Sequence, residues 1–244
     1  MRYAVFSDVH GNLEALEAVL ADAARQRPDG YLCLGDLVGY GPDPNECVAR
    51  VRALGAEAVA GNHDRAAVGE VDLDTFSPLA RAAIEWTIQA LGAEARKYLA
   101  ALPLRLETAL FLAVHGSPRD PVEEYILDLP TALAVFTESD FRLCLVGHSH
   151  IPGLFVMDRR GRIGMRALPA GESVPLDPAA RYIVNVGSVG QPRDGDPRAA
   201  YLVLDTGGPT VTLRRLRYPV EVTQRKITSA GLPILLARRL AAGL

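Results

Sequence analysis

The chain has 244 residues, of which 49% are apolar and 23% charged, and 26 basic against 29 acidic residues give a net charge of −3. This length allows one large α/β domain, and the charge balance excludes an overall basic field, so we expect no stable complex with nucleic acid. Cys33, Cys47 and Cys144 are odd in number and show no CxxC spacing, so they indicate neither a disulfide framework nor a thiolate metal site. Because no uncharged run reaches about 18 residues and the N-terminal apolar stretch is too short for a signal sequence, we expect a cytoplasmic protein without membrane contact.

The first part of the chain predicts alternating strands and helices. Residues 2–6 form a short apolar run, and apolar side chains then recur at helical spacing over residues 13–20. Buried strands are predicted over 31–34 and 58–60, with a helix between them that stops at Gly55. Two successive βαβ units predict a parallel sheet, and such sheets bind ligands at the carboxyl ends of their strands.

The rest of the chain predicts a second sheet. Residues 65–76 lack periodicity and are expected to form a mobile surface loop, whereas Ser77 and Pro78 open a helix and another covers residues 94–101. Strands are predicted over 110–114, 143–146, 154–157, 163–167, 182–186, 201–204 and 211–216, and a helix with a break near 231–233 over 222–240. Since no repeat or linker divides the chain, we expect one domain spanning residues 1–244.

All five histidines lie in short polar clusters at the ends of apolar runs. In an extended segment, residues i and i+2 project to the same side, so two such pairs are predicted to aim ligands at a shared point: Asp8 with His10, and His148 with His150. Seven side chains offer suitable donors, namely Asp8, His10, Asp36, Asn62, His115, His148 and His150. This mixture of carboxylate, imidazole and amide suits Mn, Fe, Zn, Co or Ni rather than Ca. Seven donors exceed the needs of one tetrahedral zinc ion but fill two ions if one carboxylate bridges them.

Charge counting indicates the kind of substrate. Two divalent ions bring four positive charges, Asp8 and Asp36 cancel two, and a bridging hydroxide cancels a third. The neutral amide of Asn62 leaves the remaining positive charge available for an anion such as a phosphate ester. Two ions about 3.5 to 4 Å apart can lower the pKa of a shared water and clamp phosphoryl oxygens.

Five segments of the chain resemble, in order, the five motifs of the calcineurin-like metallophosphoesterases. They are Ser7-Asp8-Val9-His10-Gly11-Asn12, Leu34-Gly35-Asp36-Leu37-Val38-Gly39, Gly61-Asn62-His63-Asp64, Val114-His115-Gly116 and Gly147-His148-Ser149-His150. Residues 185–193 resemble a segment of the small bacterial and archaeal branch, which is related to diadenosine tetraphosphatases, phosphodiesterases and protein phosphatases. The resemblance implies an α/β fold, a four-layer α/β/β/α sandwich with two mixed sheets.

The resemblance also implies roles for the residues. One ion would be held by Asp8, His10, Asp36 and His150, and the second by Asp36, Asn62, His115 and His148, with Asp36 as the bridge. His63 would face the substrate as proton donor to the leaving group or as a stabiliser of transition-state charge, with Asp64 orienting it.

Further residues are candidates for contact with the substrate. Besides Asn62, Asn12 either positions phosphate or caps the following helix. Arg193 and Arg119 lie in Gly/Pro-rich loops that could border the pocket, and Tyr40 either stacks on a substrate or packs.

The sequence therefore predicts a dinuclear phosphoesterase that acts on a phosphorylated small molecule or nucleotide through a metal-bridging hydroxide. A single surplus positive charge favours phosphodiesters, because a monoanionic diester neutralises it whereas a dianionic monoester exceeds it. A phosphomonoesterase or Ser/Thr protein phosphatase is the alternative. A non-catalytic scaffold is a remote one, since a scaffold is free to lose the ligands and His63.

Overall fold

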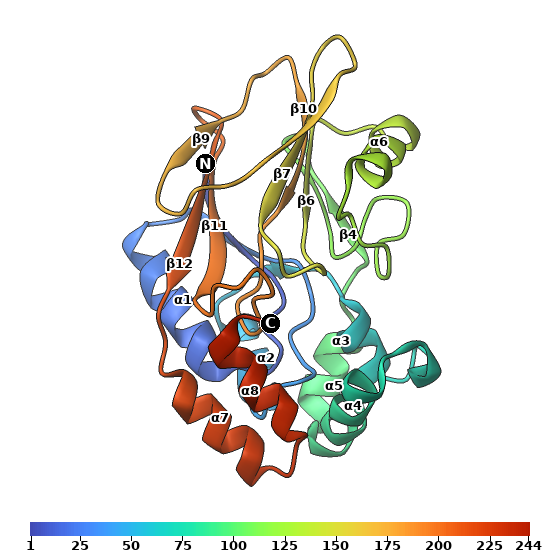
Figure 1. Ribbon diagram of the computed structural model, residues 1–244, viewed down its shortest axis with the longest axis vertical. Coiled ribbons are helices and arrows are strands. Elements are labelled where there is room, and N and C mark those ends of the chain that lie inside the picture. Colours follow the sequence, from blue (N-terminus) through green and yellow to red (C-terminus); the bar gives the residue numbers. More distant parts are fainter.

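Two six-stranded sheets face each other at the centre of the protein, whose computed structural model describes residues 1–244 (Figure 1). The first sheet has the order β3-β2-β1-β11-β12-β9, and the second has the order β4-β5-β6-β10-β7-β8. The first contains β1 (Arg2–Phe6), β2 (Gly30–Cys33), β3 (Glu57–Ala58), β9 (Ser173–Pro175), β11 (Ala199–Asp205) and β12 (Thr210–Leu216). The second contains β4 (Arg105–Glu107), β5 (Leu112–Val114), β6 (Leu143–Val146), β7 (Gly153–Met157), β8 (Ile163–Arg166) and β10 (Arg181–Asn185). Strand β1 pairs parallel with β2 and antiparallel with β11, and β10 pairs parallel with β6 and antiparallel with β7, so both sheets are mixed as predicted.

Helices lie on the outer faces of the sheets and gather at one end of them (Figure 1). They are α1 (Leu13–Arg25), α2 (Pro44–Ala53), α3 (Asn62–Ala67), α4 (Pro78–Ala90), α5 (Ala93–Ala100), α6 (Leu129–Glu138), α7 (Val220–Ser229) and α8 (Ile234–Ala242). None of them combines the length and the apolar composition that crossing a bilayer requires.

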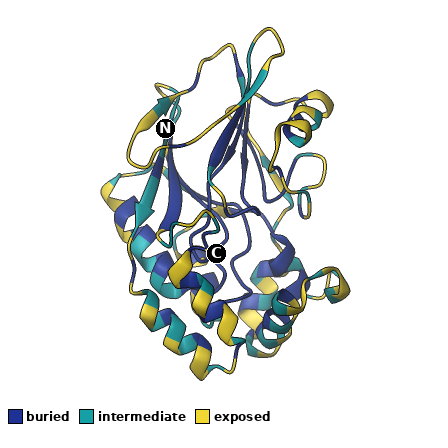
Figure 2. Ribbon diagram, viewed as in Figure 1, coloured by how far each residue is buried: buried dark blue, intermediate teal, exposed yellow.

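Alternating side chains of the strands build the layers. In β1, Tyr3 and Val5 belong to the apolar cluster between the two sheets, whereas Ala4 and Phe6 pack beneath α1 and α2. On the other sheet, Ile183 of β10 packs outward beneath α6. Figure 2 shows that the central strands and the loops between the sheets and the lower helices are buried, while the loops at the upper end and the outer faces of the helices are exposed. The predicted four-layer α/β/β/α arrangement is therefore confirmed.

The structure corrects the prediction for residues 65–76. The first of these residues belong to α3, and a short 3-10 turn follows at Leu73–Thr75. Helix α3 begins at Asn62 because the Asp64 carboxylate accepts a 3.1 Å hydrogen bond from the N–H of Gly61, which caps the first turn. The break predicted near residues 231–233 is present between α7 and α8, whereas β4, β9 and α6 were not predicted.

Candidate metal centre

The candidate ligands follow the carboxyl ends of parallel strands. Asp8 follows β1, Asp36 follows β2 and Asn62 follows β3, while His115 and His148 follow β5 and β6 of the second sheet. Parallel strands carry their carboxyl ends to one edge, which brings the five motifs together. All seven expected ligands are buried, and the most exposed of them, Asn62, keeps 6% of its surface.

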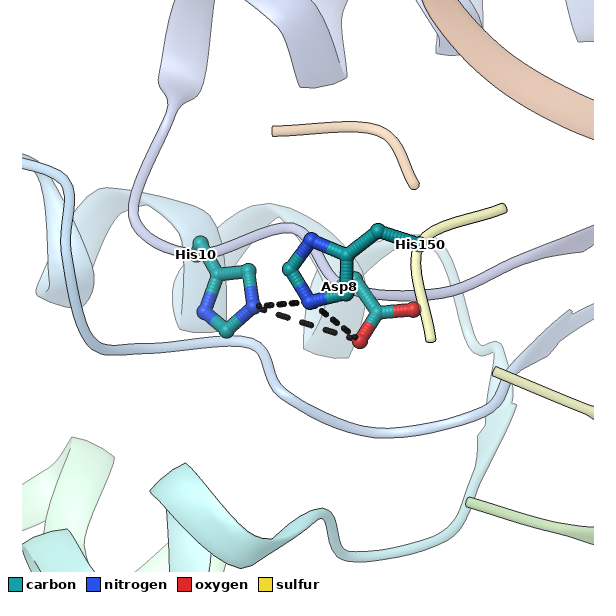
Figure 3. A group of neighbouring side chains, drawn as sticks. All are labelled: Asp8, His10 and His150. Atoms are coloured by element: carbon teal, nitrogen blue, oxygen red, sulfur yellow. Dashed lines mark hydrogen bonds and ion pairs between the residues drawn. The ribbon is translucent and has the colours of Figure 1, made fainter. Parts of the chain in front are cut away.

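Asp8, His10 and His150 form the first group, and their side chains point toward one another (Figure 3). Oδ1 of Asp8 lies 3.3 Å from Nε2 of His150 and 3.9 Å from Nε2 of His10. The two Nε2 atoms are 3.2 Å apart. One cation could therefore contact all three side chains.

Hydrogen bonds to carbonyl groups define which nitrogen of each ring carries the proton. Nδ1 of His10 lies 3.1 Å from the carbonyl of Val38, and Nδ1 of His150 lies 2.6 Å from that of Gln191. A carbonyl only accepts, so both rings are protonated at Nδ1 and both Nε2 atoms carry lone pairs. Burial lowers the pKa of both imidazoles and keeps them neutral. The two facing lone pairs cannot form a hydrogen bond with each other, and a cation between them would satisfy both.

The second group repeats this arrangement with Asp36, His115 and His148. Nδ1 of His115 lies 2.8 Å from the carbonyl of Leu34, and Nε2 of His148 lies 3.1 Å from that of Glu123. The remaining nitrogens, Nε2 of His115 and Nδ1 of His148, face each other at 3.0 Å. They too present lone pairs to a common point.

Asp36 lies between the two groups. Its Oδ2 atom is 3.5 Å from Nε2 of His10 and 3.5 Å from Nε2 of His115. This position fits a carboxylate shared by two ions.

Two buried oxygens have no hydrogen-bond partner: Oδ1 of Asp8 and Oδ1 of Asn62. An unsatisfied buried acceptor costs about 1–3 kcal/mol, more for a charged group. Both atoms belong to the expected ligand set, and both are of the type that binds divalent cations. The residues present therefore fit a pair of such ions by donor type and by geometry.

The ligand loops are left-handed turns, so the prediction that Asp8 with His10 and His148 with His150 lie in extended segments is wrong. The φ angles of these four residues and of Asp36 lie between 49° and 65°. Backbone hydrogen bonds between loops hold this unfavourable conformation, as the N–H of Asp8 donates to Gly35 and that of His10 donates to Asp36, at 3.0 and 2.9 Å. The turns, rather than strand pleating, bring each pair of side chains together.

Burial also disfavours ionisation of the carboxylates. It raises the pKa of Asp8 to about 7, and burial together with the charges of Asp64 and Asp8 raises the pKa of Asp36. A bound cation would favour the ionised forms, because it replaces the lost hydration.

His63 lies beside the first group of ligands. Its Nδ1 atom is buried without a partner, and its ring contacts those of Tyr40, His10 and Phe76 with centroid distances of 4.5, 4.8 and 5.2 Å. The ring also comes within reach of the ligand atoms of His10 and Asp36. A free nitrogen at this place could exchange a proton with a bound substrate.

Asp64 does not take the orienting role that the resemblance implied. Its carboxylate accepts hydrogen bonds from the backbone N–H groups of Leu37, Val38 and Gly61 at 2.8, 3.2 and 3.1 Å, and none from the His63 ring. Three backbone donors already occupy the carboxylate, which therefore ties the Asp36 loop to the start of α3.

Of the other candidates, Asn12 caps α1. Its Oδ1 accepts from the N–H of Ala15 at 3.1 Å, and its Nδ2 donates to the carbonyl of Gly190 and the hydroxyl of Tyr218. These bonds occupy the amide inside the protein and support the capping role over contact with phosphate.

Arg119 and Arg193, the two arginines expected in loops near the pocket, differ in their partners. Arg119 pairs with Glu124 and Glu138 at 2.6 and 3.0 Å, so it forms surface ion pairs. Arg193 donates to Gln191 at 3.0 Å and to the Tyr40 hydroxyl at 3.4 Å, makes no ion pair, and has a buried Nε without a partner. It lies close enough to the centre for its charge to lower the pKa of His63 further, after burial.

The sequence did not indicate that Tyr125 and Glu123 lie at the site. The Tyr125 ring stacks on His148 with centroids 3.7 Å apart, and the charge of the Glu123 carboxylate contributes to the raised pKa of Asp36, after burial and nearer carboxylates. Both lie in an irregular loop after His115 that carries no periodic signal.

Comparisons with known proteins agree with this geometry. Residues 1–208 match the model of the calcineurin-like phosphoesterase superfamily domain. The uncharacterized protein MJ0912 of Methanocaldococcus jannaschii is 39% identical over 246 residues, which cover 98% of this chain and 97% of that protein. A metallophosphoesterase structure from Sphaerobacter thermophilus is 46% identical with a TM-score of 0.90, over 100% of this chain and 99% of that one. A hypothetical protein from Pyrococcus horikoshii OT3, PH1004, shares the fold at 23% identity with a TM-score of 0.83, over 100% and 98%. The chain therefore belongs to the calcineurin-like phosphoesterase superfamily.

Proposed function

We propose that this protein hydrolyses phosphate esters with two divalent metal ions. The observation that carries the proposal is the pair of buried ligand groups that share Asp36, each with imidazole lone pairs turned toward a common point. Membership in a phosphoesterase superfamily supports a hydrolase. A purely structural protein has no need to bury these unsatisfied groups.

The donor types support two sets of ligands. The first comprises Asp8, His10, Asp36 and His150, and the second comprises Asp36, Asn62, His115 and His148. This donor chemistry suits Mn, Fe, Zn, Ni or Co. Two such ions, when bound, would lower the pKa of a shared water and hold phosphoryl oxygens.

His63 and Arg193 are the side chains proposed to meet the ester. Burial, and then the charge of Arg193, lowers the pKa of His63, so the free site holds a neutral ring. An anionic ester beside the two residues would raise this pKa, which lets the ring carry a proton to the leaving group. The unpaired Nε of Arg193 is a suitable donor for a phosphoryl oxygen.

Phosphodiesters are the proposed ester class, in a phosphorylated small molecule or nucleotide. Arg119 is neutralised by glutamates, which leaves fewer cations for a dianion, and the Glu123 carboxylate beside Asn62 adds negative charge near the centre. Phosphomonoesters, including phosphoserine or phosphothreonine in proteins, form the alternative class.

The whole chain is proposed to act as one domain. Helices α7 and α8 lie beyond the residues matched by the family, yet Ile227, Leu236 and Leu240 pack in one apolar cluster with Tyr40 beside His63. Their packing supports a single unit of residues 1–244.

The test combines metal analysis with paired substrates. Protein reconstituted with Mn should approach two ions per chain and hydrolyse bis(4-nitrophenyl) phosphate with a higher kcat/KM than 4-nitrophenyl phosphate. Chelation should abolish both activities and re-addition of Mn should restore them. Full hydrolysis by protein without metal would refute the dinuclear mechanism, whereas a clear preference for the monoester would refute only the ester class.

A further inference from the structure

The loop between β5 and α6 places an exposed aromatic ring against the metal centre. Tyr125 keeps 45% of its surface exposed, and its ring lies nearly parallel to that of His148, with an interplanar angle of 21° and centroids 3.7 Å apart. One face of the tyrosine therefore covers an expected metal ligand. The exposure of the residue leaves part of the ring open to solvent.

Tyr125 is exposed although it lies against buried side chains of the metal centre. Tyr40 and His63, two other rings beside the expected ligands, keep only 8% and 4% of their surface. The hydroxyl of Tyr125 makes no hydrogen bond in the structure, so no polar contact holds the ring in place. Ile151, which follows the expected ligand His150 in the chain, is also exposed, so apolar surface lies next to a ligand residue.

The loop is nevertheless firmly held. The N–H of Gly116 donates to the carbonyl of Pro121 at 2.8 Å, and Oδ1 of Asp120 accepts from the N–H groups of Val122 and Glu123, both at 3.1 Å. The carbonyl of Glu123 in turn accepts from Nε2 of His148. The loop that sets the tautomer of His148 thus also carries Tyr125, whose ring rests on His148. Because the loop is already ordered, stacking of a ligand on the ring costs little further entropy.

We propose that Tyr125 selects esters that carry a planar aromatic group, such as a nucleobase or an aryl ring, by stacking on that group while the phosphate occupies the metal centre. This inference rests on the proposed function and adds a specificity residue to it. Stacking of a base on an aromatic side chain strengthens binding by about 5- to 150-fold. Because stacking requires only an aromatic face, Tyr125→Phe should preserve the selectivity for the base.

Two ligands that differ only in the base provide the test. Adenosine 5′-monophosphate and ribose 5-phosphate share the same phosphate and sugar, and their Kd values are measured on the Mn-reconstituted protein. The wild type should bind the nucleotide more tightly. Tyr125→Leu should weaken nucleotide binding by about 5- to 150-fold and leave the affinity for ribose 5-phosphate unchanged, whereas Tyr125→Phe should retain both affinities.

Two controls separate stacking from a structural role. Tyr125→Leu should hold as much Mn as the wild type, and Leu127→Ala, an exposed change in the same loop, should alter neither affinity. Equal affinity of the wild type for the two ligands would overturn the stacking role. Equal weakening of both ligands in Tyr125→Leu, or loss of Mn, would also overturn it, because the ring would then serve only to shield His148. Failure of the Mn-reconstituted protein to hydrolyse bis(4-nitrophenyl) phosphate would instead contradict the proposed function, and the stacking role with it.

Discussion

The backbone N–H of His63 donates a 2.9 Å hydrogen bond to Oδ1 of Asp36. The other oxygen of that carboxylate faces both groups of imidazole ligands. Asp36 therefore joins the proposed bridging position to the start of the helix that carries His63. The His63 side chain itself is not part of this link, so metal binding and proton donation should respond to different substitutions.

Asp36→Asn should lower the metal content. An amide keeps the size of the side chain but removes the charge between His10 and His115 and presents at most one oxygen. Elemental analysis after Mn reconstitution should find clearly fewer ions than in the wild type, and hydrolysis should fall to background. Two ions bound with wild-type affinity would show that Asp36 is not the bridge.

His63→Ala should slow catalysis with the metal in place. Loss of a proton donor costs about 10² to 10⁴ in kcat, with the larger effect on esters with poor leaving groups. The measurement compares rates on 4-nitrophenyl and phenyl esters with Mn content, because the ring lies near two ligands. Phe76→Leu, which changes a contact of the same ring without removing a donor, is the control. Metal loss as severe as in Asp36→Asn would make His63 a ligand instead.

The positions of the candidate ligands followed from the sequence because each ends an apolar run. Runs such as those before Asp36 and His148 predict buried parallel strands, and topology carries their ends to one edge. The backbone conformation of the ligand loops could not be predicted in this way. The alternation of side chains in a strand predicted that Asp8 and His10 point to the same side. The two side chains do come together, but through a left-handed turn, because the strand already ends at Phe6.

The sequence alone could not predict roles that depend on contacts between residues far apart in the chain. Asn12 meets Tyr218, Asp64 meets Leu37, and Tyr125 meets His148 only after the sheets have formed. The three-residue strand β4 offers too few alternating positions for a periodic signal.

Asp64→Asn should destabilise the fold more than it alters the chemistry. An amide offers one acceptor oxygen to a site where three backbone N–H groups donate, so at least one buried donor loses its partner, at a cost of about 1–3 kcal/mol. Chemical denaturation of the metal-free protein measures this. Asp128→Asn, at the exposed cap of α6, should change stability by less than about 0.5 kcal/mol, since asparagine also caps helices. Equal effects of the two changes would contradict the role assigned to Asp64.

Gly147→Ala should disturb the Asp8 ligand. A Cβ at this position would contact the Ser7 hydroxyl and lie 2.8 Å from Oδ2 of Asp8, so the carboxylate must move. Weaker Mn binding is expected, with a stability loss of about 1–3 kcal/mol from overpacking. Gly208→Ala is the matched control, because a Cβ there meets open space. Unchanged Mn affinity in Gly147→Ala would show that the loop adapts without moving the ligand.

Metal binding should release the proton of the Asp8 carboxyl, and less of it as the pH rises. Burial raises the pKa of Asp8 to about 7 in the metal-free protein, so this carboxyl is mostly protonated near pH 6 and mostly ionised near about pH 9. The histidines do not contribute over this range, because burial lowers their pKa values, that of His115 to about 3. A metal ion binds the carboxylate and displaces its proton only where the proton is present, so release falls from about pH 6 to about pH 9. Calorimetric titration with Mn in buffers of different ionisation enthalpy counts these protons. Near about pH 6, Asp8→Asn should release fewer protons than the wild type, by most of one proton, and near about pH 9 this difference should vanish. Equal proton counts for the two proteins near about pH 6 would contradict the ionisation state assigned to Asp8.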